Sequence, residues 1–200
     1  MEHSNIRDYV KQGLEVYYER YNYMIEDDFC RWMHPDVPDE MKVQDGTMSS
    51  DQDWARWRII PSTVTQEDIA GLEQEFGLTF PTWYQAFIST YHHFFDIVPS
   101  QGVDDPLSDI RNMYNPVLCK LGYLPFAWDA EYGKIRCIDL SAAPDEDQCA
   151  VYEIEHEILF DLDELVAERN ILQDHLVHLY PNFKAYFDHT FLESQPVTSR

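Results

Sequence analysis

The chain has 200 residues, of which 44% are hydrophobic and 14% aromatic, enough to build a sizeable core. Its 14 basic and 37 acidic residues give a formal net charge of −23, and a field of that sign disfavours direct binding to nucleic acid or to an anionic membrane. No run of about 18 apolar residues could form a transmembrane helix, and the chain does not open on a signal peptide, so a cytoplasmic location is expected.

The N-terminal quarter of the sequence is predicted to lie outside the main domain. Apolar residues recur at steps of three and four over residues 4–33, which predicts one long helix or two shorter ones. Residues 34–53 contain Pro, Gly and Ser but few apolar residues, so they are predicted to be a linker. We therefore divide the chain into an N-terminal helical extension with its linker, residues 1–53, and a main domain, residues 54–194. The tyrosine-rich face of the extension leaves two alternatives open: it covers the main domain, or it pairs with a second copy to form a homodimer.

Three helices are predicted at the start of the main domain. Thr65 and Asp68 have the spacing of a capping box, and Gly77 stands where that helix should end. Pro81 fits the first turn of a second helix. A third helix should begin at residues 104–106 and be bent or shortened by Pro116. Its predicted inward side chains are Leu107, Ile110, Tyr114 and Leu118.

The second half of the domain changes to the period of β-strands. Residues 124–128, 134–140 and 149–158 are short runs separated by turn-forming residues, which predicts an antiparallel meander. Two closing helical segments are predicted near residues 162–179 and 182–192, separated by Pro181. Helices, then strands, then helices indicate an α+β fold with a central, mainly antiparallel sheet flanked by helices.

Motifs for catalysis, cofactors and metals are absent from the sequence. The seven glycines are scattered, without a phosphate-binding run, and there is no Gly-x-Ser-x-Gly nucleophile elbow. The four cysteines lack Cys-x-x-Cys spacing, so free thiols are expected. No catalytic residue, cofactor-binding residue or metal ligand is predicted, and the chain is expected not to be an enzyme.

The most informative pattern is a set of glutamates that alternate along the last predicted strand. They would form a carboxylate row on the open face of the sheet: Glu153, Glu155 and Glu157. No Lys or Arg occurs between Arg136 and Arg169. Two interpretations stay open: the row faces a cationic protein partner, or it is a solvated face neutralised across the hairpin by Lys134 and Arg136. The other candidate partner-binding residues lie in neighbouring turns: Asp129, Glu131, Tyr132, Asp145, Glu146 and Asp147.

Several segments carry a family resemblance through their order and spacing. They are Ile-Pro-Ser-Thr-Val-Thr at residues 60–65, Gly-Leu-Thr-Phe-Pro at 77–81, Tyr-His-His-Phe at 91–94, Gly-Tyr-Leu-Pro-Phe at 122–126 and Pro-Asn-Phe-Lys-Ala-Tyr at 181–186. Over residues 54–192 the chain thereby resembles the SUKH superfamily of yeast cell-wall regulators and bacterial immunity proteins. Residues 128–133 are bulkier than the Gly/Asp-rich turn that often follows the Leu-Pro-Phe of that family, and residues 1–53 lie outside the resemblance.

The resemblance implies an α+β fold and a bacterial immunity protein that neutralises a cognate secreted or contact-dependent toxin by direct stoichiometric binding. Such a toxin domain would carry a basic surface, and a nuclease is the favoured class. The alternative is a non-enzymatic intracellular scaffold or regulatory protein-binding module, which the eukaryotic relatives suggest. The resemblance carries over no catalytic residue and no contact residue.

Overall fold

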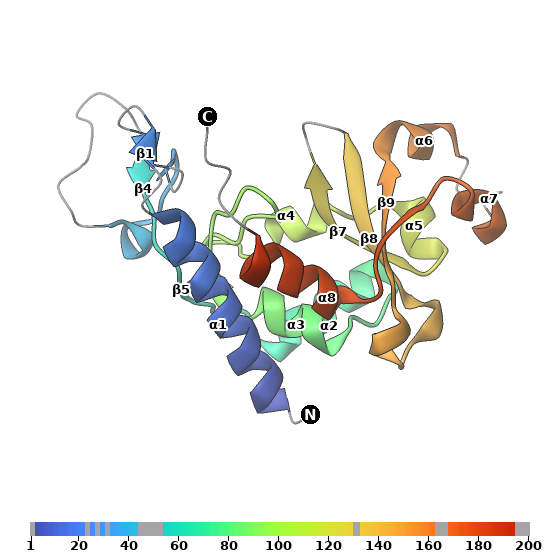
Figure 1. Ribbon diagram of the computed structural model, residues 1–200, viewed down its shortest axis with the longest axis horizontal. Helices are drawn as coiled ribbons and strands as arrows, with labels where there is room; N and C mark the ends of the chain where they lie inside the picture. Colours follow the sequence, from blue (N-terminus) through green and yellow to red (C-terminus); the bar gives the residue numbers. More distant parts are fainter. Residues whose placement is uncertain are drawn as a thin grey trace.

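A central antiparallel sheet organises the second half of the chain. It consists of β7 (Tyr123–Asp129), β8 (Lys134–Asp139), β9 (Val151–Glu155) and β10 (Val177–Tyr180), in the order β10-β9-β8-β7 (Figure 1). This computed structural model describes residues 3–22, 25–26, 29–30, 33–43, 54–129, 133–162 and 168–194. The predicted α+β class and the predicted meander of three strands are confirmed.

The fourth strand lies where a helix was predicted. Over residues 162–179 the described part of the chain forms only the short helix α7 (Arg169–Gln173), and β10 follows it and pairs with β9. The alternating Val-His-Leu-Tyr of β10 fits a pleated sheet, and β9 offers a free edge for hydrogen bonding. The prediction of a helix reaching residue 179 is therefore wrong, because pairing with a distant strand outweighs the local helical pattern.

The N-terminal helix is shorter than the sequence predicts. Helix α1 (His3–Asn22) is followed by three short strands, β1 (Ile25–Glu26), β2 (Phe29–Cys30) and β3 (Met33–His34). β1 pairs with β2, and β3 pairs with β4 (Ala55–Arg56) beyond the predicted linker. The helical prediction is thus wrong beyond Asn22, since the chain there finds backbone partners in strands.

The helices at the start of the main domain follow their local signals. In α2 (Gln66–Phe76) the side chains and backbone amides of Thr65 and Asp68 bond reciprocally, as in a capping box, and Gly77 ends the helix with a left-handed φ of 65°. Helix α3 (Thr82–Ile88) begins directly after Pro81. The short strand β5 (Ile60–Pro61) precedes these helices in the chain and β6 (Tyr91–His92) follows them, and the two strands pair with each other.

The predicted third helix is in fact two short helices, α4 (Ser108–Arg111) and α5 (Pro116–Lys120). Asn115 caps α5 by accepting a hydrogen bond from the amide of Leu118 at 3.0 Å, and Pro116 occupies the first turn. The break turns Tyr114 outward, with 47% of its surface exposed, so its predicted inward position is wrong.

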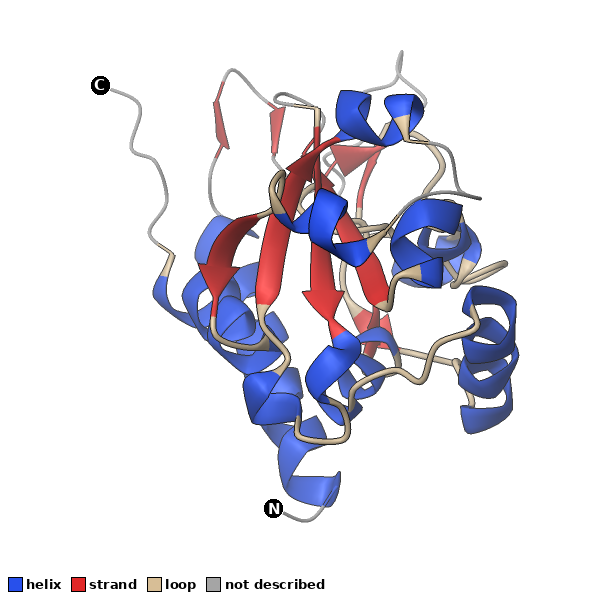
Figure 2. Ribbon diagram, turned by 90° about the vertical axis from the view of Figure 1, so that its right-hand side faces the viewer, coloured by secondary structure: helices blue, strands red, loops and turns tan. Residues whose placement is uncertain are grey.

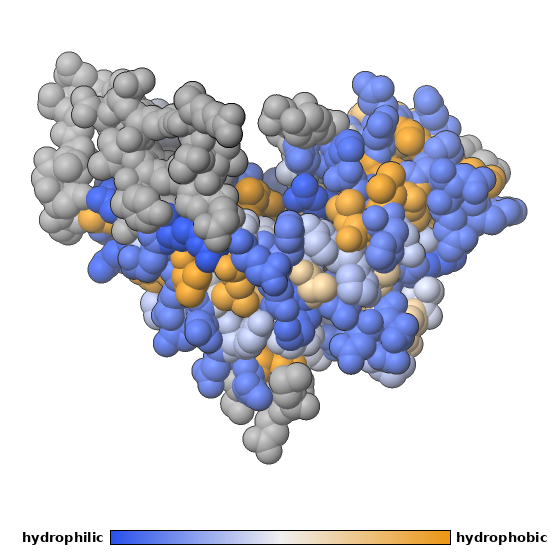
Figure 3. Space-filling view, viewed as in Figure 1, coloured by the Kyte–Doolittle hydropathy of each residue, from blue (hydrophilic) through white to orange (hydrophobic). Residues whose placement is uncertain are grey.

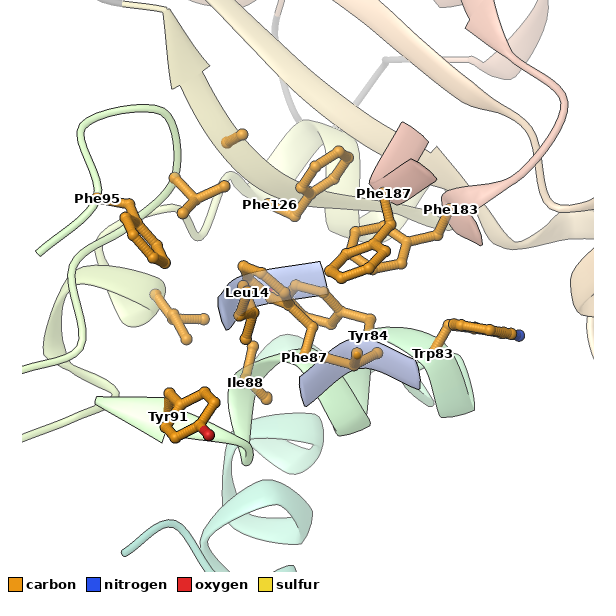
Figure 4. Packing of buried hydrophobic residues seen from close by; sticks show 14 of the residues in the cluster. Leu14, Trp83, Tyr84, Phe87, Ile88, Tyr91, Phe95, Phe126, Phe183 and Phe187 are labelled. Carbon is orange, nitrogen blue, oxygen red and sulfur yellow. The ribbon is translucent and has the colours of Figure 1, made fainter. Parts of the chain in front are cut away.

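The main core lies between α1, α3, the inner face of the sheet and α8 (Phe183–Phe187), which continues as a π-helical stretch, Asp188–Glu193. Figure 4 shows Leu14 of α1, Phe87 of α3 and Phe126 of β7 meeting Phe183 and Phe187 of α8. The first alternative for the N-terminal extension therefore matches the structure: α1 covers the main domain. Pairing with a second copy stays a prediction.

The opposite face of the sheet is covered as well. A second, smaller core forms there from side chains of α5, α7 and α6 (His156–Asp161), packed on β7, β8 and β9. Figure 2 shows helices on both sides of the sheet. The buried members of this second core are Val117, Leu118, Tyr123, Ile135, Cys137, Ile154, Leu159 and Leu172. Both faces of the sheet are therefore largely occupied.

Two helical glycines provide a test of how tightly α1 is packed. A methyl group added at Gly13 would collide with the buried ring of Phe187, whereas one added at Gly71 on α2 would meet nothing within 4 Å. We expect Gly13→Ala to lower the free energy of unfolding by about 1–3 kcal/mol through overpacking. The matched change Gly71→Ala should raise it by about 0.4–1 kcal/mol. Urea unfolding measures both, and a stabilising Gly13→Ala would mean that α1 does not close on α8.

Candidate functional site

The glutamates of β9 do not form an open carboxylate row. Glu153 lies opposite Arg136 in the sheet and is only 9% exposed. Its carboxylate accepts a hydrogen bond from Lys134 Nζ at 2.7 Å, and its second oxygen lies 3.7 Å from Arg136 Nε. A buried carboxylate requires such partners because the loss of hydration is costly. Glu153 is therefore neutralised within the sheet, as the second interpretation of the sequence supposed.

The other two glutamates are exposed but belong to different elements. Glu155 ends β9, and Glu157 lies in the first turn of α6, which begins at His156. The His156 amide still bonds to the carbonyl of Gly133 at 2.8 Å, and the chain then turns into the helix. The predicted alternation of Glu153, Glu155 and Glu157 on one open strand face is thus wrong.

The turn acids have mixed positions. Asp145 and Asp147 are exposed, but Glu146 accepts hydrogen bonds from the amides at the start of α3, including that of Thr82 at 2.7 Å. Asp129 is half-buried, 3.6 Å from Arg136 Nη2. Glu146 and Asp129 therefore have structural contacts. Two further candidates lie outside the described residues: Glu131 and Tyr132.

Charge removal at Glu153 tests whether this carboxylate has a structural role in the sheet. Glu153→Gln keeps the size of the side chain but leaves Lys134 and Arg136 without their shared counter-charge, so we expect the free energy of unfolding to fall by about 1–3 kcal/mol. The matched change Glu155→Gln, at an exposed position on the same strand, should alter it by less than about 0.5 kcal/mol. Urea denaturation compares the two variants, and equal effects would contradict a structural role for Glu153.

Three aromatic rings in edge-to-face contact lie where the sheet meets α6, and the outer two are exposed. The ring centroids of Trp128 and His156 are 4.5 Å apart, and those of His156 and Phe160 are 4.4 Å apart, both edge to face. Trp128 stands near the end of β7, while His156 and Phe160 are one turn apart on α6. Trp128 is 38% exposed and Phe160 is 73% exposed. We call these three residues the aromatic ladder.

Carboxylates border the aromatic ladder. Glu155 precedes His156, and Glu157 and Asp161 lie on the same helix as Phe160; all three acids are exposed. In Figure 3, hydrophobic side chains are visible among hydrophilic ones at the upper right, over the region of β9 and α6. From the sequence, Trp128 is a candidate anchor because it is an aromatic residue near the acids, and a core position is the open alternative. Phe160 was missed because the strand was predicted to continue to residue 158.

The buried titratable groups have structural surroundings. His93 stacks 4.6 Å from Phe95, and burial lowers its pKa to about 3. His92 Nε2 accepts a hydrogen bond from the Thr63 amide at 2.9 Å, and burial lowers its pKa too. Both rings are therefore neutral near pH 7.

The thiols are also shielded. Cys119, Cys137 and Cys149 are free and buried, as expected, and burial raises the pKa of Cys119 to about 11. The side chain of Cys30 lies outside the described residues. Within the described ranges, no three His, Cys, Asp or Glu side chains gather in a way that could hold a metal ion. Nor does any helix in those ranges combine the length and apolar character needed to cross a bilayer.

Comparison with known proteins shows to which family the chain is similar. A search of curated proteins finds no match to the chain. The sequence model of the SMI1 / KNR4 family (SUKH-1) matches residues 63–189, which is more than half of the chain and runs from the entry to α2 through α8. The α+β fold and the segments singled out in the sequence agree with that match, and the chain belongs to the SMI1 / KNR4 family (SUKH-1).

Proposed function

We propose that this protein is a cytoplasmic immunity protein that neutralises a toxin by direct stoichiometric binding through the surface around the aromatic ladder. The family includes toxin-immunity proteins. The observation that carries the proposal is the ladder itself: aromatic rings in edge-to-face contact, with Trp128 and Phe160 exposed, bordered by carboxylates on a chain of net charge −23.

The ladder has the properties of a binding anchor. Large aromatic side chains supply much of the binding energy at protein interfaces, and Phe160 is 73% exposed in the free protein. The contact of His156 with both neighbouring rings limits their motion, so less entropy is lost when a partner packs on them. The surrounding acids favour fast association with a basic protein. A nuclease fits, because its substrate requires a basic surface.

The test is co-expression with the product of the neighbouring gene, scored by its toxicity when expressed alone, by growth rescue and by the Kd of the purified pair. Phe160→Ala should weaken binding by roughly 30-fold, the equivalent of about 2 kcal/mol for an aromatic anchor, and should reduce rescue. Ile171→Ala, which truncates another exposed apolar side chain, on α7, is the matched control and should leave Kd unchanged.

Two results would count against the proposal. Undiminished affinity in Phe160→Ala would place the interface away from the ladder. A neighbouring gene product that binds without being toxic would favour the scaffold or regulatory module instead.

A further inference from the structure

We propose that a shallow pocket on the other side of Trp128 receives an arginine side chain of the protein partner. This inference rests on the proposed function and names the chemistry that the partner must present. The pocket has a volume of about 310 Å³ and lies between the loop of residues 95–100, helix α4 and the end of β7. Its lining includes two carboxylates, Asp96 and Asp109, and an apolar wall formed by Val98, Met113 and Trp128.

The walls of the pocket are held in place by the fold. The loop is closed at its base by two backbone hydrogen bonds between His93 and Gln101, at 2.8 and 3.1 Å. Phe95, 1% exposed, anchors the loop in the main core, and Ile110, 2% exposed, anchors α4. Because both sides are fixed before a partner arrives, little conformational entropy is lost on binding.

The charge of Asp109 is not cancelled by the described side chains around it. Arg111, on the same helix as Asp109, is turned toward Asp105 at 3.0 Å and Glu75 at 3.2 Å. His34 lies near Asp109, but burial lowers the pKa of its imidazole below 6.5, so it is neutral at pH 7. Asp109 thus contributes negative charge at the rim of the pocket.

This combination of walls matches arginine better than other ligands. Arginine has an apolar stem that packs on Met113 and Val98, a planar head that stacks on an indole, and donors for carboxylates. An anion would be repelled by Asp109. The volume lies at the lower limit of the range of about 300–1,000 Å³ that is typical of small-molecule sites, and the pocket is shallow, so a single protruding side chain fills it better than a cofactor.

Trp128 connects the pocket with the aromatic ladder. Trp128 lines the pocket, and its ring also contacts His156 of the ladder. A partner that presents an arginine next to an apolar side chain would therefore engage both parts at once. Asp109 would select the basic residue, and Phe160 would contact the apolar one.

The experiment titrates the full-length protein with Nα-acetyl-arginine amide and follows the indole N–H signals by ¹H–¹⁵N NMR. Trp128→Phe identifies the signal of Trp128. We expect a saturable shift of that signal with the arginine probe and none with the citrulline analogue, which has nearly the same shape but no charge. Asp109→Asn should weaken binding by up to about fivefold, as expected for a solvent-accessible ion pair. Asp174→Asn, at an exposed aspartate beyond α7, is the matched control.

The proposal is overturned if the Trp128 signal shows no saturable shift, if citrulline shifts it equally, or if Asp109→Asn binds the probe as tightly as the original protein. The probe contains no toxin, so such a result would remove the arginine pocket while growth rescue still decides the immunity function. Conversely, a specific shift together with failed rescue would keep the pocket and reject the immunity function.

Discussion

Phe87→Ala is expected to lower the free energy of unfolding by about 3–5 kcal/mol, the range for removing a buried phenylalanine side chain. Phe87 is 3% exposed, and its ring centroid lies 5.5 Å from that of Phe191 and 5.9 Å from that of Phe183. The cavity would open between α3 and α8, where rings from both helices enclose it. The surrounding rings cannot collapse into the space without disturbing the packing of α1 as well.

Urea unfolding followed by circular dichroism measures this loss. Phe160→Ala removes the same atoms from a position that is 73% exposed, and it should change stability by less than about 0.5 kcal/mol. A similar loss in the two variants would show that the interior between α3 and α8 is not packed as described.

Acidification is expected to destabilise the protein below pH 6.5 through His93. Its ring is buried against Phe87 and Phe95, and burial lowers its pKa from 6.5 to about 3. In this window the unfolded chain binds a proton that the folded protein does not, so stability is full above pH 6.5 and falls as the pH decreases toward 3. The loss is about 1.4 kcal/mol for each pH unit well inside the window.

The measurement compares unfolding free energies at pH 7 and pH 5. The original protein should lose about 2 kcal/mol more than His93→Leu between these pH values, because the variant has no imidazole to protonate at this site. His175→Gln, at an exposed histidine, should lose as much as the original protein. If His93→Leu loses as much too, the imidazole of His93 is protonated without unfolding.

Features fixed by neighbouring residues could be predicted from the sequence. Thr65, Asp68 and Gly77 define the start and end of α2 because the capping groups and the left-handed turn act within a few residues. Pro116 likewise marks a helix boundary, although the sequence alone did not show that Asn115 would cap a separate helix. The meander was predicted because turn-forming residues separate its strands, which follow one another in the sheet.

Features that depend on distant partners could not be predicted. The strand character of Val177–Tyr180 comes from pairing with β9, and that of Met33–His34 comes from pairing with Ala55–Arg56. The same holds for the site. Alternation along β9 correctly predicted that Glu153 lies near Lys134 and Arg136. It could not show that helices cover both faces of the sheet. Phe160 and Asp109 gain their proposed roles only from the position of Trp128.

The two borders of the sheet limit how a partner can attach. The outer strand β10 has four residues, and its register with β9 shifts between His178 and Tyr180. On the other border, β7 carries Pro125, which has no amide hydrogen, next to a second irregularity in its pairing with β8. Neither border offers an uninterrupted row of backbone donors and acceptors, so extension of the sheet by a foreign strand is disfavoured. Recognition is left to side chains, and specificity can then change by single substitutions without disturbing the hydrogen bonds that hold the strands together.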